Sequence, residues 1–205
     1  MKVKWLGHSC FLVEAADYSI ALDPYGDGIV PGLRPLTIEA NQVLTSHDHG
    51  DHNATSVVQL EPCGASPFTI ARMQSAHDDQ DGALRGKNTI HILEAAGIRI
   101  AHLGDLGQAL TDAQAAEIGR LDALLIPIGG HYTIDAKQAY ETAQRLSPTV
   151  TIPMHYRTDR FGYDVIGPLF DFTKLFEDEE VRMLPGDTII ITADMPKQVA
   201  VLQYK

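Results

Sequence analysis

Two segments far apart in the chain share one pattern of residues. Residues 11–23 and 91–105 each contain an apolar run, the tripeptide Glu-Ala-Ala, a second apolar run and then an aspartate, Asp23 or Asp105. A further apolar run, a loop and a predicted helix follow each copy. Two such strand–strand–strand–helix halves predict two β-sheets packed face to face with helices outside. The alternative left open is a chance likeness between two ordinary hairpins.

The 205 residues fit the size of one domain, which we expect to cover residues 1–205. β-branched runs that end at Gly, Asp or Pro predict strands, and capped runs of helical periodicity predict helices. The expected helices cover 53–60, 111–119, 135–147 and about 168–178. The expected strands cover 2–6, 10–14, 18–22, 42–46, 67–71, 88–94, 98–103, 122–127, 149–153, 187–192 and 198–203.

Composition narrows the class of partner. The formal net charge of −11 argues against nucleic acid and anionic membranes, because both attract Lys and Arg. No apolar run approaches the ~18 residues of a membrane helix, so no membrane insertion is expected. Cys10 and Cys63 are too few for a disulfide framework, which indicates a reducing compartment. The sequence therefore predicts a soluble, cytoplasmic protein.

Three of the nine histidines lie in the segment His47-Asp48-His49-Gly50-Asp51-His52. On an extended chain His47 and His49 point the same way and can bind one ion. Gly50 permits a sharp turn, after which Asp51 and His52 diverge toward a second ion. In a chain of this composition His-x-His-x-Asp-His arises by chance about 0.0015 times. Imidazole and carboxylate without nearby cysteine favour a divalent metal site over a structural thiolate site, and the alternative is a polar surface loop.

This segment resembles the metal loop of the metallo-β-lactamase-fold hydrolases, which is His-x-His-x-Asp-His after a strand. The stretches at 5–11, 22–24, 102–105 and 153–156 are similar to a narrower branch. That branch contains small cytoplasmic Zn-dependent hydrolases related to ascorbate-6-phosphate lactonase and to the N-acyl-phosphatidylethanolamine phospholipases. The resemblance extends from residue 1 to about 158. It implies an α+β fold, the four-layer αββα sandwich of two mixed β-sheets, which agrees with the repeat.

The resemblance also implies a set of metal ligands. His77 stands where the branch carries the third histidine of the first metal. We interpret His91, inside a predicted strand, as structural, and His102 as a residue that orients a ligand rather than binding metal. The implied ligands are His47, His49 and His77 for one metal, Asp51, His52 and His155 for the other, and Asp105 as the bridge.

Two divalent ions, zinc or manganese, would keep such a site positive despite its two carboxylates. The expected reaction is attack by metal-bound hydroxide on an ester, lactone or phosphodiester bond of a small anionic substrate. Besides the ligand Asp51, the catalytic candidates are Asp48, placed to help deprotonate water, and His131, which the repeat turns toward the metal loop. The candidate substrate contacts are His8, Tyr132, Tyr156 and Arg157.

The sequence leaves three other functions open. A nuclease of the same fold would need basic patches, which the net charge of −11 disfavours. A redox di-iron protein would carry a carboxylate at the position of His49. A non-catalytic metal-binding or regulatory protein would tolerate the loss of some metal ligands. The implied ligand set in this sequence is complete, which argues against that function. A homo-oligomer is the default expectation for a small soluble enzyme.

Overall fold

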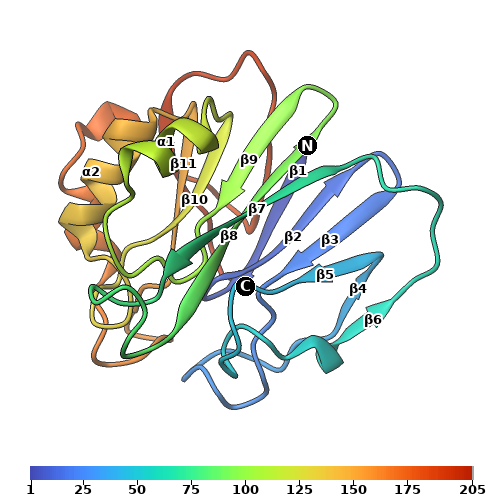
Figure 1. Ribbon diagram of the computed structural model, residues 1–205, viewed down its shortest axis with the longest axis horizontal. Helices are drawn as coiled ribbons and strands as arrows, with labels where there is room; N and C mark the ends of the chain where they lie inside the picture. Colours follow the sequence, from blue (N-terminus) through green and yellow to red (C-terminus); the bar gives the residue numbers. More distant parts are fainter. Residues whose placement is uncertain (205) are drawn as a thin grey trace.

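The computed structural model describes residues 1–204, which form two large β-sheets facing each other (Figure 1). The five-stranded sheet has the order β13-β1-β2-β3-β5 and the seven-stranded sheet the order β12-β14-β11-β10-β9-β8-β7. The first sheet comprises β1 (Lys2–Gly7), β2 (Cys10–Ala15), β3 (Tyr18–Leu22), β5 (Gln42–Leu44) and β13 (Thr188–Ile190). The second comprises β7 (Thr69–Ala76), β8 (Lys87–Ala95), β9 (Ile98–His102), β10 (Ala123–Pro127), β11 (Val150–Met154), β12 (Val181–Met183) and β14 (Gln198–Val201).

The repeat corresponds to two equivalent strand arrangements, one in each sheet. Strands β2 and β3 are antiparallel, as are β8 and β9, and each pair is joined by a two-residue turn. The turns begin at Ala16 and Ala96, whose φ angles of 49° and 52° are left-handed, as tight hairpins require. The second strand of each hairpin then pairs in parallel with a later strand, β3 with β5 and β9 with β10. The predicted α+β class and the two mixed sheets are confirmed.

The helices pack with the seven-stranded sheet (Figure 1). Helix α1 (Asp112–Ile118) begins at a capping box on Thr111, and α2 (Ala136–Leu146) begins at one on Asp135, as predicted. Helix α2 buries an apolar face against β10 and also packs against α3 (Leu169–Thr173). No helix among residues 1–204 combines the length and the apolar character needed to cross a bilayer.

Two helix predictions need correction. The helix expected at 53–60 is wrong, because only the 3₁₀ turn η1 (Thr55–Val57) forms before β6 (Val58–Leu60) pairs with β4 (Ile38–Ala40). Valines suit strand pairing better than a helix, since branching at Cβ restricts their rotamers. The helix expected at 168–178 is only α3, followed by the 3₁₀ turn η2 (Asp178–Glu180). The sequence did not predict strands β4, β6 and β12. Each has only three residues, which is too few to show the alternation of apolar and polar residues typical of a strand.

The strand directions decide where the site lies. Strands β1, β3 and β5 run the same way, and so do β7, β9, β10 and β11. Buried imidazoles join the two sheets, because His91 Nε2 donates to Thr45 O and His102 Nε2 donates to Ser9 O, both at 2.9 Å. The loops that follow these parallel-running strands therefore meet at one edge of the sandwich.

Candidate metal centre

Every predicted metal ligand follows the end of a strand at that edge. His47, His49, Asp51 and His52 follow β5, His77 follows β7, Asp105 follows β9 and His155 follows β11. Two further residues arrive in the same way, since His8 follows β1 and Asp23 follows β3. His8, Asp23 and His155 have positive φ angles of 51°, 45° and 54°, an uncommon backbone for residues other than glycine. Such left-handed residues are concentrated at functional sites.

The first predicted ligand triad is assembled. His47, His49 and His77 bring ligand atoms within 4.8 Å of one another. His77 Nε2 lies 3.2 Å from His49 Nδ1, and the ring centroids of His47 and His77 are 4.4 Å apart. His77 is buried and His49 is exposed. An ion in this group would therefore be reached from solvent on the side of His49.

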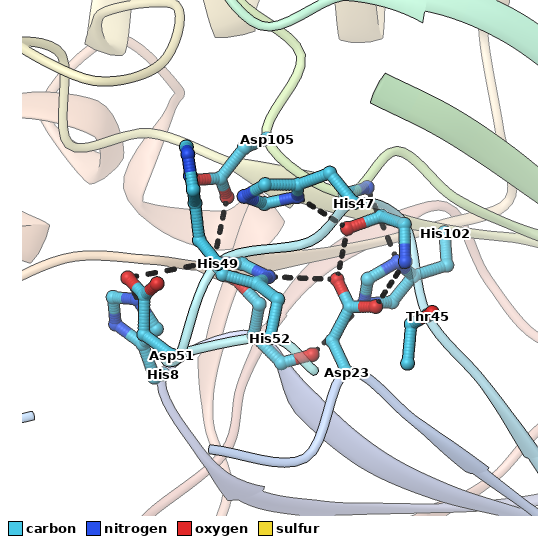
Figure 2. A network of polar contacts seen from close by, with 12 residues as sticks. His8, Asp23, Thr45, His47, His49, Asp51, His52, His102 and Asp105 are labelled. Carbon is cyan, nitrogen blue, oxygen red and sulfur yellow. Dashed lines mark hydrogen bonds and ion pairs between the residues drawn. The ribbon is translucent and has the colours of Figure 1, made fainter. Parts of the chain in front are cut away.

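The second predicted group is also assembled, with one additional member. Asp51, His52 and His155 gather with His8, whose Nε2 lies 3.3 Å from Asp51 Oδ2. The rings of His8 and His155 are 4.1 Å apart. His8, predicted as a substrate contact, thus lies among the potential ligands (Figure 2).

Asp105 lies between the two groups. Its Oδ1 is 3.2 Å from His52 Nε2, and its Oδ2 is 3.3 Å from His155 Nε2 and 3.7 Å from His77 Nε2. Four ligands about 2.1 Å from a tetrahedral zinc ion would be about 3.4 Å from one another. The spacing of these atoms is therefore the spacing that a metal ion would require.

Several buried polar atoms of the cluster lack hydrogen-bond partners, as is expected of atoms that bind a metal ion. The buried atoms without a hydrogen-bond partner among the described residues include the Nε2 atoms of His47, His52 and His155, and Oδ1 of Asp105. Buried polar atoms are normally paired, because an unpaired one costs about 1–3 kcal/mol. These are lone-pair atoms suited to a divalent cation, so the residues present fit the expected metal.

Asp23 contacts the cluster directly and was not selected as a site residue from the sequence. Its fully buried carboxylate accepts hydrogen bonds from Ser46 N at 2.6 Å, Ser46 Oγ at 2.5 Å and His52 Nδ1 at 2.8 Å (Figure 2). Burial alone would raise the pKa of Asp23, but the charges of His102 and His52 and these hydrogen bonds lower it to about 2. Donation from Nδ1 leaves Nε2 of His52 directed toward Asp105, which fixes the orientation of a candidate metal ligand. The repeat marked Asp23 as the counterpart of Asp105, and this was the available signal.

The titration behaviour of the cluster follows from burial and from its carboxylates. Burial opposes protonation of His52, but Asp105 and Asp23 on opposite sides raise its pKa well above the usual value. Burial and neighbouring histidines lower the pKa of His8 to about 4, and burial chiefly lowers that of His47 to about 3. The charges of His155 and His52 hold the pKa of Asp105 well below its usual value despite burial. In the metal-free protein the two carboxylates therefore favour the protonated form of His52.

Several predicted site residues lie outside the ligand groups. Asp48 is exposed and accepts a hydrogen bond from Asn53 Nδ2. His131 is exposed, with its ring against Tyr132. Tyr156 is buried against Trp5, and Arg157 Nε donates to Ile166 O. His91 and His102, the two sheet-joining histidines, are in none of the ligand groups, consistent with the interpretation of their roles.

A cavity of about 290 Å³ opens onto the cluster. Of the predicted substrate contacts, Tyr132 lines it. No motif or periodicity in the sequence selects Arg85. The residues that line the cavity are His49, Asp51, His77, Arg85, Asp105, Tyr132 and Tyr163.

Comparisons with known proteins agree with the fold and the site. Residues 2–155 match the family model described as "Beta-lactamase superfamily domain". A UPF0173 metal-dependent hydrolase of Carboxydothermus hydrogenoformans is 30% identical over 193 residues, covering 77% of this chain and 85% of the relative. The chain therefore belongs to the metallo-β-lactamase superfamily.

Two solved structures extend the comparison to three dimensions. One, from Thermotoga maritima, is described as a Zn-dependent hydrolase of the metallo-β-lactamase superfamily. It is 34% identical, with a TM-score of 0.77, over 100% of this chain and 99% of that one. The metallo hydrolase Igni18 from Ignicoccus hospitalis is 25% identical, with a TM-score of 0.69, over 92% and 97%. Together with the assembled ligands, these relatives identify the chain as a metal-dependent hydrolase.

Proposed function

We propose that the protein uses two divalent metal ions to hydrolyse an ester, lactone or phosphodiester bond in a small anionic molecule. The observation that carries this proposal is the position of Asp105 between two sets of ligands. His47, His49 and His77 would hold one ion. Asp51, His52 and His155, with His8 beside them, would hold the other. Candidate ligands of both ions line the cavity, His49 and His77 for one and Asp51 for the other, so a substrate there would reach both, as catalytic sites require.

A bound pair of divalent ions supplies Lewis acidity, which lowers the pKa of water and polarises the bond under attack. Residues of the chain orient the candidate ligands and would balance part of the metal charge. Asp23 fixes the ring of His52, and the charges of Asp51 and Asp105 offset part of the metal charge. Tyr163 Oη lies 3.5 Å from Asp51 Oδ2, and burial raises the pKa of this phenol, so the hydroxyl remains a proton donor at neutral pH.

The size of the cavity supports a small substrate. A volume of about 290 Å³ is at the lower end of the range for small-molecule sites. Histidine and aspartate accept both zinc and manganese, and we propose zinc as the first metal to test. We further propose that residues 1–205 form a single domain that works in the cytoplasm, in keeping with the free thiols of Cys10 and Cys63.

Metal analysis combined with turnover tests the proposal. The protein loaded with zinc or manganese should contain two ions per chain and hydrolyse at least one member of a panel of lactones, phosphodiesters and thioesters. Asp105→Ala should lose at least one ion and the turnover. Asp178→Ala, which removes an exposed carboxylate in η2, is the matched control and should retain both. Fewer than one ion per chain after loading would refute the two-metal proposal.

A further inference from the structure

Arg85 forms no ion pair with any carboxylate among residues 1–204. Arg99, Arg120 and Arg145, in contrast, each form one. It lines the same cavity as Asp51 and Asp105 without an ion-pair contact to either. Its side chain instead lies over the ring of Tyr132, with Cζ 5.5 Å from the ring centroid. A half-buried guanidinium held on an aromatic face beside a catalytic cleft is available to a ligand.

The loop that carries Arg85 is fixed by one carboxylate. Asp78 Oδ1 accepts from Gln80 N and Gly82 N, and Asp78 Oδ2 accepts from Leu84 N and Arg85 N, at 2.7–2.9 Å. These four backbone donors lower the pKa of Asp78 to about 2, although its desolvation opposes the change. Both oxygens of Asp78 are thereby occupied by backbone, and the Arg85 side chain is left free. The same loop begins at His77, so the arginine is held at a fixed place relative to a proposed metal ligand.

Two tyrosines complete this wall of the cavity. Tyr132 and Tyr163 come from different loops, and their rings are 5.9 Å apart, edge to face. Tyr163 also places its ring 5.7 Å from His8 and its hydroxyl near Asp51. The guanidinium of Arg85, the ring of Tyr132 and the phenol of Tyr163 therefore form a row of contacts that ends at the second ligand group.

We infer that Arg85, supported by Tyr132 and Tyr163, binds an oxyanion of the substrate, a carboxylate or a phosphate, and so selects substrates that carry this group beside the bond to be cleaved. This inference rests on the proposed hydrolysis and specifies its substrate class. The guanidinium is suited to the task because its fork of donors matches the two oxygens of a carboxylate or phosphate.

The test compares two esters with the same leaving group on the zinc-loaded protein. 4-Nitrophenyl acetate is neutral, whereas 4-nitrophenyl hemisuccinate carries a carboxylate. The measured quantity is the ratio of kcat/KM for the anionic ester to that for the neutral ester. Arg85→Gln should lower this ratio at least tenfold. Arg182→Gln removes the same charge from an exposed position on β12 and should leave the ratio within twofold of the wild-type value.

The source of the oxyanion is distinguished by inhibition with succinate or inorganic phosphate. The anion that Arg85 recognises should inhibit Arg85→Gln at least tenfold more weakly than the wild-type protein. Turnover with an unchanged ratio and unchanged inhibition in Arg85→Gln would overturn the inference and leave the proposed hydrolysis intact. If neither ester is turned over, the failure concerns hydrolysis of these esters. In that case calorimetry measures the binding of both anions to the zinc-loaded wild-type and Arg85→Gln proteins. Equal affinities in the two proteins would overturn the inference.

Discussion

Replacing Asp23 by Asn should cost both stability and metal affinity. The pKa of Asp23 falls from 3.8 to about 2 in the fold, and the carboxyl is fully buried. At about 1.4 kcal/mol per pKa unit, its ionised form stabilises the metal-free protein by about 2 kcal/mol. Because the pKa is lower in the folded state, this contribution is complete above about pH 4 and disappears as the pH falls through 2. Asp23→Asn should therefore lower the midpoint of thermal unfolding at pH 7 by about 4–8 °C.

The effect on metal follows from the tautomer of His52. Asp23 accepts the Nδ1 proton, which leaves the Nε2 lone pair for an ion. An amide NH₂ placed at Oδ2 would face the same nitrogen with a donor, so the proton would move to Nε2. Asp23→Asn should weaken binding of the ion held by His52 by about 10–100-fold, as loss of such supporting partners commonly does.

Calorimetric zinc titration and thermal unfolding of the metal-free protein measure the two effects separately. Asp17→Asn, at an exposed position in the turn before β3, is the matched control and should behave as wild type in both. Wild-type metal affinity in Asp23→Asn would refute the orienting role of Asp23. Wild-type stability from pH 5 to 8 would refute the energetic role of its charge.

The remaining predictions concern metal and pH. His77→Ala should bind one ion fewer and lose at least a hundredfold in kcat/KM, checked by metal analysis and kinetics; two retained ions would contradict its assignment. Chelation should lower the unfolding midpoint, since each ion present at about 1,000 times its Kd adds about 4 kcal/mol; an unchanged midpoint would show that no ion was bound. Because the protonated form of His52 is favoured in the metal-free protein, zinc binding should release a proton and tighten up to about tenfold per pH unit below its raised pKa. Calorimetry in buffers of different ionisation enthalpy measures that release, and its absence would refute the protonation of His52.

Two parts of the candidate ligand cluster follow local patterns in the sequence, whereas His77 and His155 were expected only from the family resemblance. The spacing within 47–52 is a property of one loop, and the strand pattern around 91–105 places Asp105 at a strand end. The helix expected at 53–60 was wrong because β6 gains its hydrogen bonds from β4, a segment of three residues without a detectable period. That pairing depends on tertiary structure and leaves little trace in the sequence.

The substrate side of the site was harder to predict. Tyr156 follows His155, whose left-handed backbone breaks the alternation of β11, and its ring packs against Trp5 instead of entering the cavity. Arg85 belongs to a loop ordered by four backbone bonds to Asp78, and no periodicity or motif describes such a loop. The positions of side chains on irregular loops can therefore be found only from the three-dimensional structure.

The candidate ligands follow the ends of four different strands, β5, β7, β9 and β11, so the geometry of the centre depends on the register of each of these strands. A strand advances about 3.3 Å per residue, so a slip of one position would displace its ligand by the full distance that separates neighbouring ligand atoms here, 3.2–3.7 Å. Such a slip would also turn the ligand to the opposite face of the sheet. Only a chain with all these strands correctly aligned would bind both of the proposed ions. Metal content would then measure the fraction of correctly folded molecules in a preparation, independently of any knowledge of the substrate.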